Sequence, residues 1–374
     1  MCVLFLLYKL LYASTGPLEH LRLFRYLSVR TLGGALTAFV IVVVFGPRFI
    51  ALLQTRGIGE QSRRVGNLDV SVKKGTATMG GALILASVLA AAILWCNPTN
   101  RFVQVALASG LLYGLLGAWD DLLKMRSGSS EGGLPRAFKY LGQILFAALL
   151  AIILLSPSSS PLSAAGSPDV ARTLYVPFLK TGLYLGIAYL GFLILFMVCA
   201  SNSVNLTDGM DGLAIVPGML LALVLGTFAY VTGRADWSEY LQYPYLPGAG
   251  ELCVLCGIIT GAAAGFLWFN AYPATLMMGD TGALALGGLL GAVATLVKQE
   301  LLFFIAGGLF VLELLSTFVQ DHIGLGLLGR RILFRAPLHH SLLYRGMSET
   351  KVTIRLWIVA GIFALFSLAT LKLR

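Results

Sequence analysis

Five carboxylates lie at the ends of three strongly apolar segments of this chain. Asp120 and Asp121 close the first segment, Asp208 and Asp211 follow the second, and Asp280 follows the third. The 374 residues include only 17 Asp and Glu. Acidic side chains near a membrane are costly unless they are paired, hydrated or bound to metal, so their placement predicts a functional site. The alternative is that each is a helix-end residue solvated by lipid headgroups.

If the three segment ends face the same side of a membrane, the five acids are expected to converge on one divalent cation. A few carboxylates with room for water suit Mg²⁺, and a ligand set of oxygens alone argues against zinc and iron. Asp120 and Asp121 point about 100° apart on a helix, so we expect them to have different roles. Gly209 and Gly212 predict a break in the helix beside the second pair of acids, which is tolerated where backbone lines a cavity or is buried in protein.

Basic residues that suit phosphate occur near these acids in the sequence and in the loops. His339 and His340 lie in a segment rich in Arg, and histidine can bind phosphate as a cation or carry protons near neutral pH. Lys73, Lys124 and Lys139 are candidates for binding diphosphate oxygens. The alternatives are surface histidines and lysines that only follow the usual cytoplasmic excess of positive charge. With the acids and Mg²⁺, these cations predict phosphoryl-group transfer between a soluble and a lipid substrate.

The composition is that of a polytopic α-helical membrane protein. Mean hydropathy is +0.84, 57% of the residues are hydrophobic and 12% are charged, which excludes an ordinary soluble domain. Because a span needs ~20 apolar residues, we expect ten transmembrane helices in one membrane domain over residues 1–374. They lie near 34–54, 78–96, 103–120, 138–156, 180–200, 213–232, 251–269, 282–297, 302–320 and 354–371.

Charge predicts the partners and the orientation. A formal charge of +10 suits anionic lipid headgroups and phosphorylated substrates, whereas nucleic acid is not expected because the basic residues are divided among short loops. The loops after odd-numbered spans hold thirteen Lys and Arg, and those after even-numbered spans hold five. Short cytoplasmic loops are enriched in Lys and Arg, so both termini are predicted outside. All five acids and the histidine pair are then on the cytoplasmic side.

At these residues the chain resembles a known family, the polyprenyl-phosphate N-acetylhexosamine-1-phosphate transferases. The resemblance runs nearly end to end. The motifs that carry it are Lys73-Lys74-Gly75-Thr76-Ala77-Thr78-Met79-Gly80-Gly81, Trp119-Asp120-Asp121, Asn205-Leu206-Thr207-Asp208-Gly209-Met210-Asp211-Gly212, Phe266-Leu267-Trp268-Phe269-Asn270, Met278-Gly279-Asp280 and Ala336-Pro337-Leu338-His339-His340. The first and last of these motifs favour the phospho-N-acetylmuramoyl-pentapeptide transferase branch.

The resemblance implies a multi-pass enzyme of the bacterial cytoplasmic (inner) membrane that acts in peptidoglycan synthesis. It implies ten transmembrane helices, a cytoplasmic active site and a homodimer. Phospho-MurNAc-pentapeptide would move from UDP-MurNAc-pentapeptide to undecaprenyl phosphate, giving lipid I and UMP, with Mg²⁺ required. The lipid phosphate would attack the β-phosphate directly, and a covalent aspartyl-phosphate on Asp120 is the alternative.

The same resemblance implies roles for individual residues. Asp280 is the expected metal ligand with Asp208, Asp120 is the candidate for activating the lipid phosphate, and Asp121 supports it. The nucleotide and metal side would be lined by Asn205, Asp208, Asp211 and Asn270. The phosphate-side groups would be Lys73, Lys124, Lys139, His339 and, less directly, His340.

Two positions depart from the family pattern. Ser341 stands where the family usually has a third histidine, so we expect that position to be dispensable or compensated. Met277 stands three residues before Asp280, where an aromatic residue is common and a uracil could stack. A thioether can pack against a base but offers no ring, so nucleoside-type inhibitors are expected to bind differently.

Three other functions compete with this interpretation. A sister enzyme that transfers GlcNAc-1-phosphate to undecaprenyl phosphate would share the acids, and the segment 321–352 argues against it. A transporter would use the acids for ion coupling, but transporter sites typically lie near the membrane midplane within inverted repeats, and no repeat is visible. An inactive scaffold would not need the full set of acids.

Overall fold

The structure is a computed structural model that describes residues 3–4, 22–59, 64–65, 68–69, 76–129, 132–165 and 168–373. The described residues are mostly helical, which confirms the all-α prediction. Two short antiparallel hairpins accompany the helices, β1 (Arg64–Val65) with β2 (Leu68–Asp69) and β3 (Thr173–Leu174) with β4 (Leu183–Tyr184). Helices are the expected form because a backbone surrounded by lipid must satisfy its hydrogen bonds within each segment.

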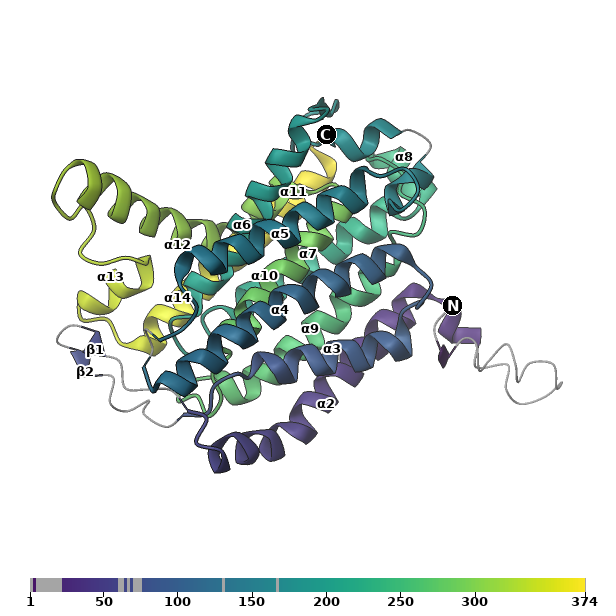
Figure 1. The fold of residues 1–374 in the computed structure, drawn as a ribbon. Helices are drawn as coiled ribbons and strands as arrows, with labels where there is room; N and C mark the ends of the chain where they lie inside the picture. The colour runs from purple at the N-terminus through teal and green to yellow at the C-terminus, as the bar shows by residue number, and fades with distance from the viewer. Residues whose placement is uncertain are drawn as a thin grey trace.

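Eight helices in the described part of the chain are long and apolar enough to cross a membrane, so the chain is a polytopic membrane protein. They are α2 (Leu27–Thr55), α4 (Arg101–Ser127), α5 (Arg136–Leu155), α6 (Ala188–Thr207), α7 (Ile215–Thr232), α9 (Glu251–Asn270), α10 (Gly279–Leu296) and α14 (Glu349–Ala369). Figure 1 shows them as a bundle of roughly aligned helices that run obliquely across the view.

The other two predicted spans are helices of a different kind. The shorter apolar helix α3 (Gly81–Trp95) corresponds to the segment predicted near 78–96. The segment predicted near 302–320 forms α11 (Glu300–Ala306) and α12 (Gly308–Phe318), which meet at Gly307 with a bend of 87°. Beyond the bend, α12 continues as the π-helix η5 (Val319–Leu327), and this arm extends away from the bundle on the left of Figure 1.

Several boundaries differ from the prediction, and the helix expected at 34–54 already begins at Leu27. The span expected at 180–200 becomes helical only at Ala188, because β4 pairs with β3 instead of joining the helix. The span expected to end at 120 continues to Ser127. The shorter elements are η3 (Pro161–Ala165), η4 (Pro168–Arg172), α8 (Ala235–Leu241), α13 (Leu338–Tyr344) and η6 (Thr370–Lys372).

The helix α10 lies at the centre of the bundle. Within their most apolar windows, 89% of the residues of α10 are buried by the rest of the protein, against 22% for α2. The helix packs closely on α4, since a β-carbon placed on Gly117 would lie 2.2 Å from the carbonyl oxygen of Asp280. Small residues permit such close contact between membrane helices. This contact sets the first turn of α10 directly against the last third of α4.

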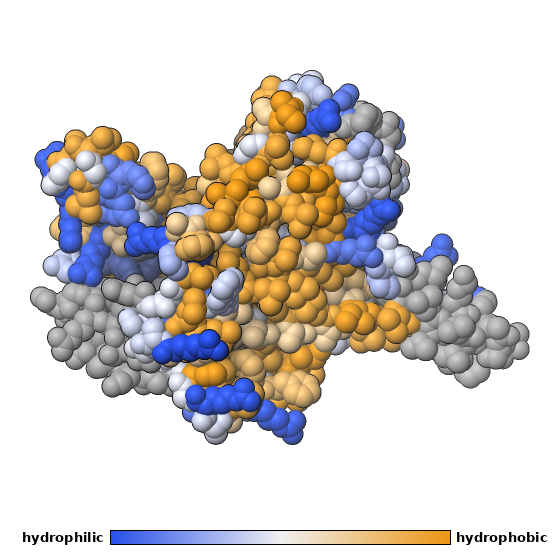
Figure 2. All heavy atoms as spheres, viewed as in Figure 1, coloured by the Kyte–Doolittle hydropathy of each residue, from blue (hydrophilic) through white to orange (hydrophobic). Residues whose placement is uncertain are grey.

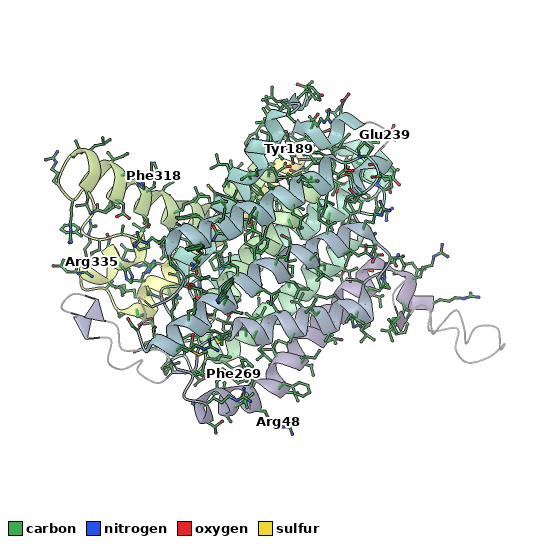
Figure 3. The ribbon with its side chains drawn as sticks, viewed as in Figure 1. Arg48, Tyr189, Glu239, Phe269, Phe318 and Arg335 are labelled. Atoms are coloured by element: carbon green, nitrogen blue, oxygen red, sulfur yellow. The ribbon has the colours of Figure 1, made fainter. Side chains whose placement is uncertain are left out.

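The hydrophilic residues lie away from the apolar middle of the bundle. In the view of Figure 2, hydrophobic residues cover the centre of the molecule and hydrophilic residues gather toward its edges. Figure 3 shows Phe269 and Arg48 toward one end of the bundle and Tyr189 and Glu239 toward the other. The helices α4, α6 and α9 end at the Phe269 end, while α5, α7 and α10 begin there. We call this the Phe269 end.

Candidate active site

Three acids meet where α4 runs past the start of α10. Each of Asp120, Asp121 and Asp280 offers a carboxylate oxygen, and these oxygens all lie within 4.8 Å of one another. Asp120 and Asp121 are 2% and 6% exposed, so they are shielded from bulk water. Like charges this close repel each other strongly in a buried site unless cations or hydrogen bonds compensate them.

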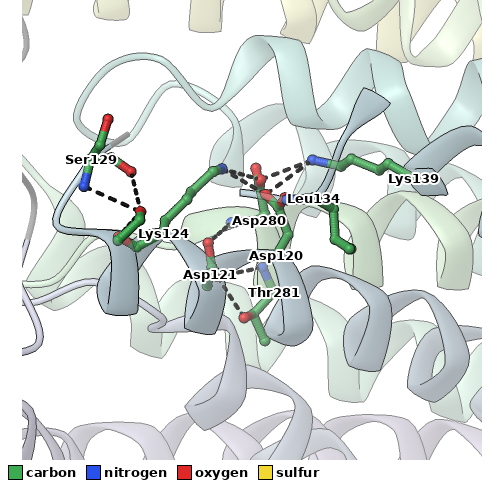
Figure 4. Close-up of polar contacts among 9 residues, drawn as sticks. Asp120, Asp121, Lys124, Ser129, Leu134, Lys139, Asp280 and Thr281 are labelled. Carbon is green, nitrogen blue, oxygen red and sulfur yellow. Dashed lines mark hydrogen bonds and ion pairs between the residues drawn. The ribbon is translucent and has the colours of Figure 1, made fainter. Parts of the chain in front are cut away.

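Two lysines supply that compensation (Figure 4). Lys124, one turn after Asp120 on α4, places its Nζ 2.7 Å from Oδ2 of Asp120 and also contacts Oδ2 of Asp280. Lys139, in the first turn of α5, lies 2.8 Å from the same Asp280 oxygen and 3.5 Å from Oδ2 of Asp120. Asp120 and Asp280 therefore share two ammonium groups, one from each of two helices.

The second oxygen of Asp120 is held by the chain that leads into α5. The backbone N–H of Leu134 donates to Oδ1 of Asp120 at 2.7 Å. Because Leu134 and Lys139 belong to the same short stretch, this bond fixes the start of α5 relative to α4. The carboxylate of Asp120 thus accepts from a backbone amide on one side and faces ammonium groups on the other.

Asp121 has a different set of partners. Its Oδ1 accepts from the backbone N–H of Asp280 at 3.2 Å, and its Oδ2 accepts from the backbone N–H and the hydroxyl of Thr281 at 2.8 and 2.6 Å. The first amides of a helix have no partner within the helix and favour negative charge. Asp121 therefore caps α10 from the neighbouring helix and holds Asp280 in place, as expected for two adjacent acids with different roles.

Gly279 makes this contact possible. Its φ is +72°, a backbone conformation that other residues rarely adopt, and a β-carbon there would lie 2.9 Å from Oδ2 of Asp121. A side chain would therefore cost both backbone strain and a clash with the acid. The Met-Gly-Asp motif thus has a conformational explanation in the turn that delivers Asp280.

The group of acids suits a magnesium ion. Both oxygens of Asp121 already accept hydrogen bonds from the first turn of α10, whereas Asp120 and Asp280 face the two lysines. Mg²⁺ typically binds one or two carboxylates together with substrate phosphates. Asp120 and Asp280 are therefore the residues that could hold the ion, and Lys124 and Lys139 could then pair with phosphate oxygens.

Asp208 and Asp211 lie outside the three-acid group in the described structure, so their convergence on the same cation stays a prediction. Asp208 is the residue after α6, where the predicted break occurs. Asp211 is 3% exposed, and its Oδ2 accepts from the backbone N–H of Ala274 at 3.0 Å. Asp211 therefore ties the α6–α7 loop to the segment between α9 and α10.

Two predicted asparagines also belong to this loop region. Asn270 is 1% exposed, accepts from the N–H of Gly212 at 3.0 Å and donates to the carbonyl of Leu276 at 2.9 Å. Its amide is thus engaged in holding two loops together. Asn205 lies in the last turn of α6 and is half-buried.

The predicted histidines lie on α13. His339 is fully buried, and its backbone N–H donates to Glu313 of α12 at 3.2 Å. The rings of His339 and His340 are 4.3 Å apart. Ser341 donates its hydroxyl to the carbonyl of Arg335 and accepts from the N–H of Arg335 at 3.1 Å. The serine therefore closes the loop before α13, which is a structural use for the position that departs from the family pattern.

The remaining predicted positions have separate outcomes. Lys73 lies outside the described residues. Met277 is 8% exposed, and its backbone N–H donates to the carbonyl of Ala77 at 2.8 Å.

The sequence interpretation did not include Thr281, Leu134 or Glu313. Only Glu313 had a usable signal, since it is an acid in the middle of an apolar run.

One comparison with known proteins bears on the site. Residues 103–298, just over half of the chain, match the family described as Glycosyl transferase family 4. The matched range contains the three acids and both lysines, as well as Asp208, Asp211 and Asn270. The histidines of α13 lie beyond it.

Proposed function

Because the chain belongs to glycosyl transferase family 4, we propose that it transfers phospho-MurNAc-pentapeptide from UDP-MurNAc-pentapeptide to undecaprenyl phosphate. Membership assigns the general activity, which is transfer of a sugar phosphate to a polyprenyl phosphate by a membrane-bound transferase. The products proposed here are lipid I and UMP. This identity of the substrates rests on the resemblance of the motifs to the muramoyl-pentapeptide branch.

The observation that carries the proposal is the group formed by Asp120, Asp280, Lys124 and Lys139. Its carboxylates and ammonium groups come from three helices and meet at the Phe269 end of the bundle. Transfer between two phosphates accumulates negative charge, and fixed cations that face this charge lower the barrier. A group of this kind has no evident use in a scaffold.

We propose that the acceptor phosphate attacks the β-phosphate of the donor directly. In this route Asp120 orients the acceptor phosphate or takes its proton, while Lys124 and Lys139 neutralise the phosphate oxygens. Asp120 already accepts from Leu134 N–H and faces Lys124, and both contacts lower its reactivity as a nucleophile. This favours direct attack over a covalent aspartyl-phosphate.

Mg²⁺ is proposed as the cofactor, held by Asp280 and Asp120. When bound, such an ion supplies positive charge to the diphosphate and to the leaving UMP. Asp121 keeps Asp280 in place through the first turn of α10. The role of Asp208 as a second metal ligand remains a prediction, as do the roles of Asn205, Lys73 and His340 toward substrate.

The proposal includes a location and an assembly. The Phe269 end lies on the cytoplasmic side of a bacterial inner membrane, where UDP-linked sugars are available. The protein assembles as a homodimer. The acceptor reaches the site from the membrane and the donor from the cytoplasm.

The first experiment measures UMP release by purified protein. Undecaprenyl phosphate is offered with UDP-MurNAc-pentapeptide or with UDP-GlcNAc, each with and without Mg²⁺. We expect Mg²⁺-dependent UMP release with the muramoyl donor alone. Release only with UDP-GlcNAc would move the protein to the sister branch, and no release with either donor from folded protein would refute the proposal.

Asp280→Asn tests the metal assignment in the same assay. This variant keeps the size of the side chain but loses the charge shared by two lysines, so we expect turnover to fall at least a thousandfold. The matched control is Asp236→Asn, which alters an exposed acid paired with Arg234 on α8. Retained Mg²⁺-dependent turnover in Asp280→Asn would contradict the assignment.

A further inference from the structure

Glu313 is an acid buried inside an apolar helix. It lies on α12, six residues beyond the bend at Gly307, and is 0% exposed. Burying a carboxylate is costly unless hydrogen bonds or cations compensate it. Its cross-helix partner in the described structure is a single residue, His339 on α13.

The contact between Glu313 and His339 involves both backbone and ring. The N–H of His339 donates to the two carboxylate oxygens at 3.2 and 3.4 Å. The ring Nδ1 of His339 lies 3.2 Å from Oε2. The carboxylate therefore fixes the start of α13 and also stands beside one nitrogen of the imidazole.

The other face of the imidazole meets the α6–α7 loop. A β-carbon placed on Gly209 would lie 2.4 Å from Nε2 of His339, so only a glycine fits against the ring. Within the described residues neither ring nitrogen has a hydrogen-bond partner, although the ring is fully buried, and Nδ1 is the nitrogen that lies beside the carboxylate. The imidazole is thus held between Glu313 and the loop that begins at Asp208.

We propose that Glu313 is a positioning residue that acts through His339. A carboxylate beside one ring nitrogen of a histidine selects the tautomer and orients the other nitrogen. Here it keeps the proton on Nδ1 and directs Nε2 toward the loop at Asp208. The inference rests on the proposed function, in which His339 is a phosphate-side group, and adds a residue to it.

Packing alone does not explain why residue 313 is a glutamate. A leucine or methionine of similar volume would fill the same space in α12 without the cost of burying a charge. Beyond the bend at Gly307, Glu313 on α12 lies against α13. Its carboxylate is the contact through which α12 holds the start of α13, where His339 lies. Glu313 itself touches no reacting group and is distinct from a catalytic residue.

The kinetic test compares Glu313→Gln, Glu313→Ala, His339→Ala and the double variant Glu313→Ala/His339→Ala. Mutating a residue that orients a functional histidine typically lowers activity or metal affinity about 10- to 100-fold. We expect Glu313→Ala and His339→Ala to lower kcat by similar factors, with KM for the donor within about twofold of wild type. The double variant should be no slower than His339→Ala, because both changes remove the same contribution. Losses that multiply would overturn the inference.

Glu313→Gln separates charge from shape. The amide oxygen can still accept from the N–H of His339, so this variant keeps the contact that holds the start of α13 and tests the inference independently of the folding of Glu313→Ala. Its kcat should lie between those of wild type and His339→Ala, and a wild-type kcat would overturn the inference. The control is Asp236→Asn, which changes an exposed acid far from α13 and leaves the buried ion pairs intact.

Hydrogen–deuterium exchange gives a readout independent of turnover. The amide of His339 should exchange at least tenfold faster in Glu313→Ala, and remain protected in Glu313→Gln and Asp236→Asn. Unchanged exchange in Glu313→Ala would refute the positioning role. A wild-type protein that releases no UMP would instead refute the proposed function, while the exchange result would still decide whether Glu313 holds His339.

Discussion

At the residue scale, Asp121 illustrates why two adjacent acids are not equivalent. Asp120 shares ammonium groups with Asp280, whereas Asp121 accepts three hydrogen bonds from the first turn of α10. The sequence predicts that the two acids diverge, because neighbours on a helix point in different directions. It does not predict their partners, which depend on how α4 and α10 are rotated against each other.

Asp121→Asn should weaken both the fold and the metal site. Asparagine offers one acceptor oxygen, and its amide hydrogens would face the N–H groups of α10. Loss of a helix cap costs ~0.5–2 kcal/mol, and displacement of Asp280 should raise the Mg²⁺ concentration needed for half-maximal activity. Thermal unfolding and Mg²⁺ titration of UMP release measure the two effects.

Thr281→Val provides the graded control for this prediction. It removes only the hydroxyl that donates to Asp121 and keeps both backbone bonds, so its effects on melting and on Mg²⁺ requirement should be smaller. A Mg²⁺ requirement unchanged from wild type in Asp121→Asn would show that the cap does not position Asp280.

At the scale of elements, the turn into α10 depends on Gly279. Gly279→Ala should lower the melting temperature, since a side chain at positive φ costs roughly 1–2 kcal/mol and its β-carbon meets Asp121. Gly128→Ala is the matched control, because Gly128 also has a positive φ of +64° but nothing lies within 4 Å of its β-carbon. Equal losses of melting temperature and activity in the two variants would contradict this account.

A buried ion pair between Lys298 and Glu300 lies at the opposite end of α10. The ammonium of Lys298 is fully buried, 2.9 Å from Glu300 and 2.7 Å from the hydroxyl of Tyr189. Burial lowers the pKa of Lys298, and the neighbouring Glu300 opposes that shift. The contacts join α6, the end of α10 and the start of α11.

Lys298→Met should be strongly destabilising. Removing one partner of a buried ion pair typically costs ~3–5 kcal/mol, because the other charge stays buried without compensation. The double variant Lys298→Met/Glu300→Gln should therefore melt at a higher temperature than Lys298→Met alone. Thermal unfolding in detergent checks this, and a double variant less stable than the single one would contradict it.

Much of this architecture follows from the sequence because long apolar runs have few structural options in a membrane. The ten predicted segments coincide with apolar helices, although α6 starts eight residues later than expected. The bend between α11 and α12 was missed because Gly307 and Gly308 stand in an unbroken apolar run, and glycine pairs are common throughout this chain. A bend of this kind is set by packing against neighbouring helices, which hydropathy does not record.

At the scale of the whole molecule, the orientation can be tested directly. We expect the Phe269 end to face the cytoplasm, from the excess of Lys and Arg in its loops. In a variant with the native cysteines replaced, Ser158→Cys should react with a membrane-impermeant thiol reagent from outside intact cells. Ser129→Cys should react only after permeabilisation.

Both serines are exposed and lie at opposite ends of the helices, Ser129 just after α4 and Ser158 just after α5. They therefore form a matched pair for labelling. The reverse pattern would place the three acids outside, where a cytoplasmic UDP-sugar could not reach them.

The length of α4 beyond Asp121 has a consequence for where the chemistry occurs. The helix continues for six residues to Ser127, which places the acids ~9 Å below its tip. Beside them begins α3, whose 15 residues span only ~22 Å at 1.5 Å per residue, less than the ~30 Å thickness of a hydrocarbon core. A span this short is accommodated by thinning of the bilayer around it, which we expect beside α3. We therefore expect acyl-chain length to influence how easily a lipid phosphate reaches the acids beside α3.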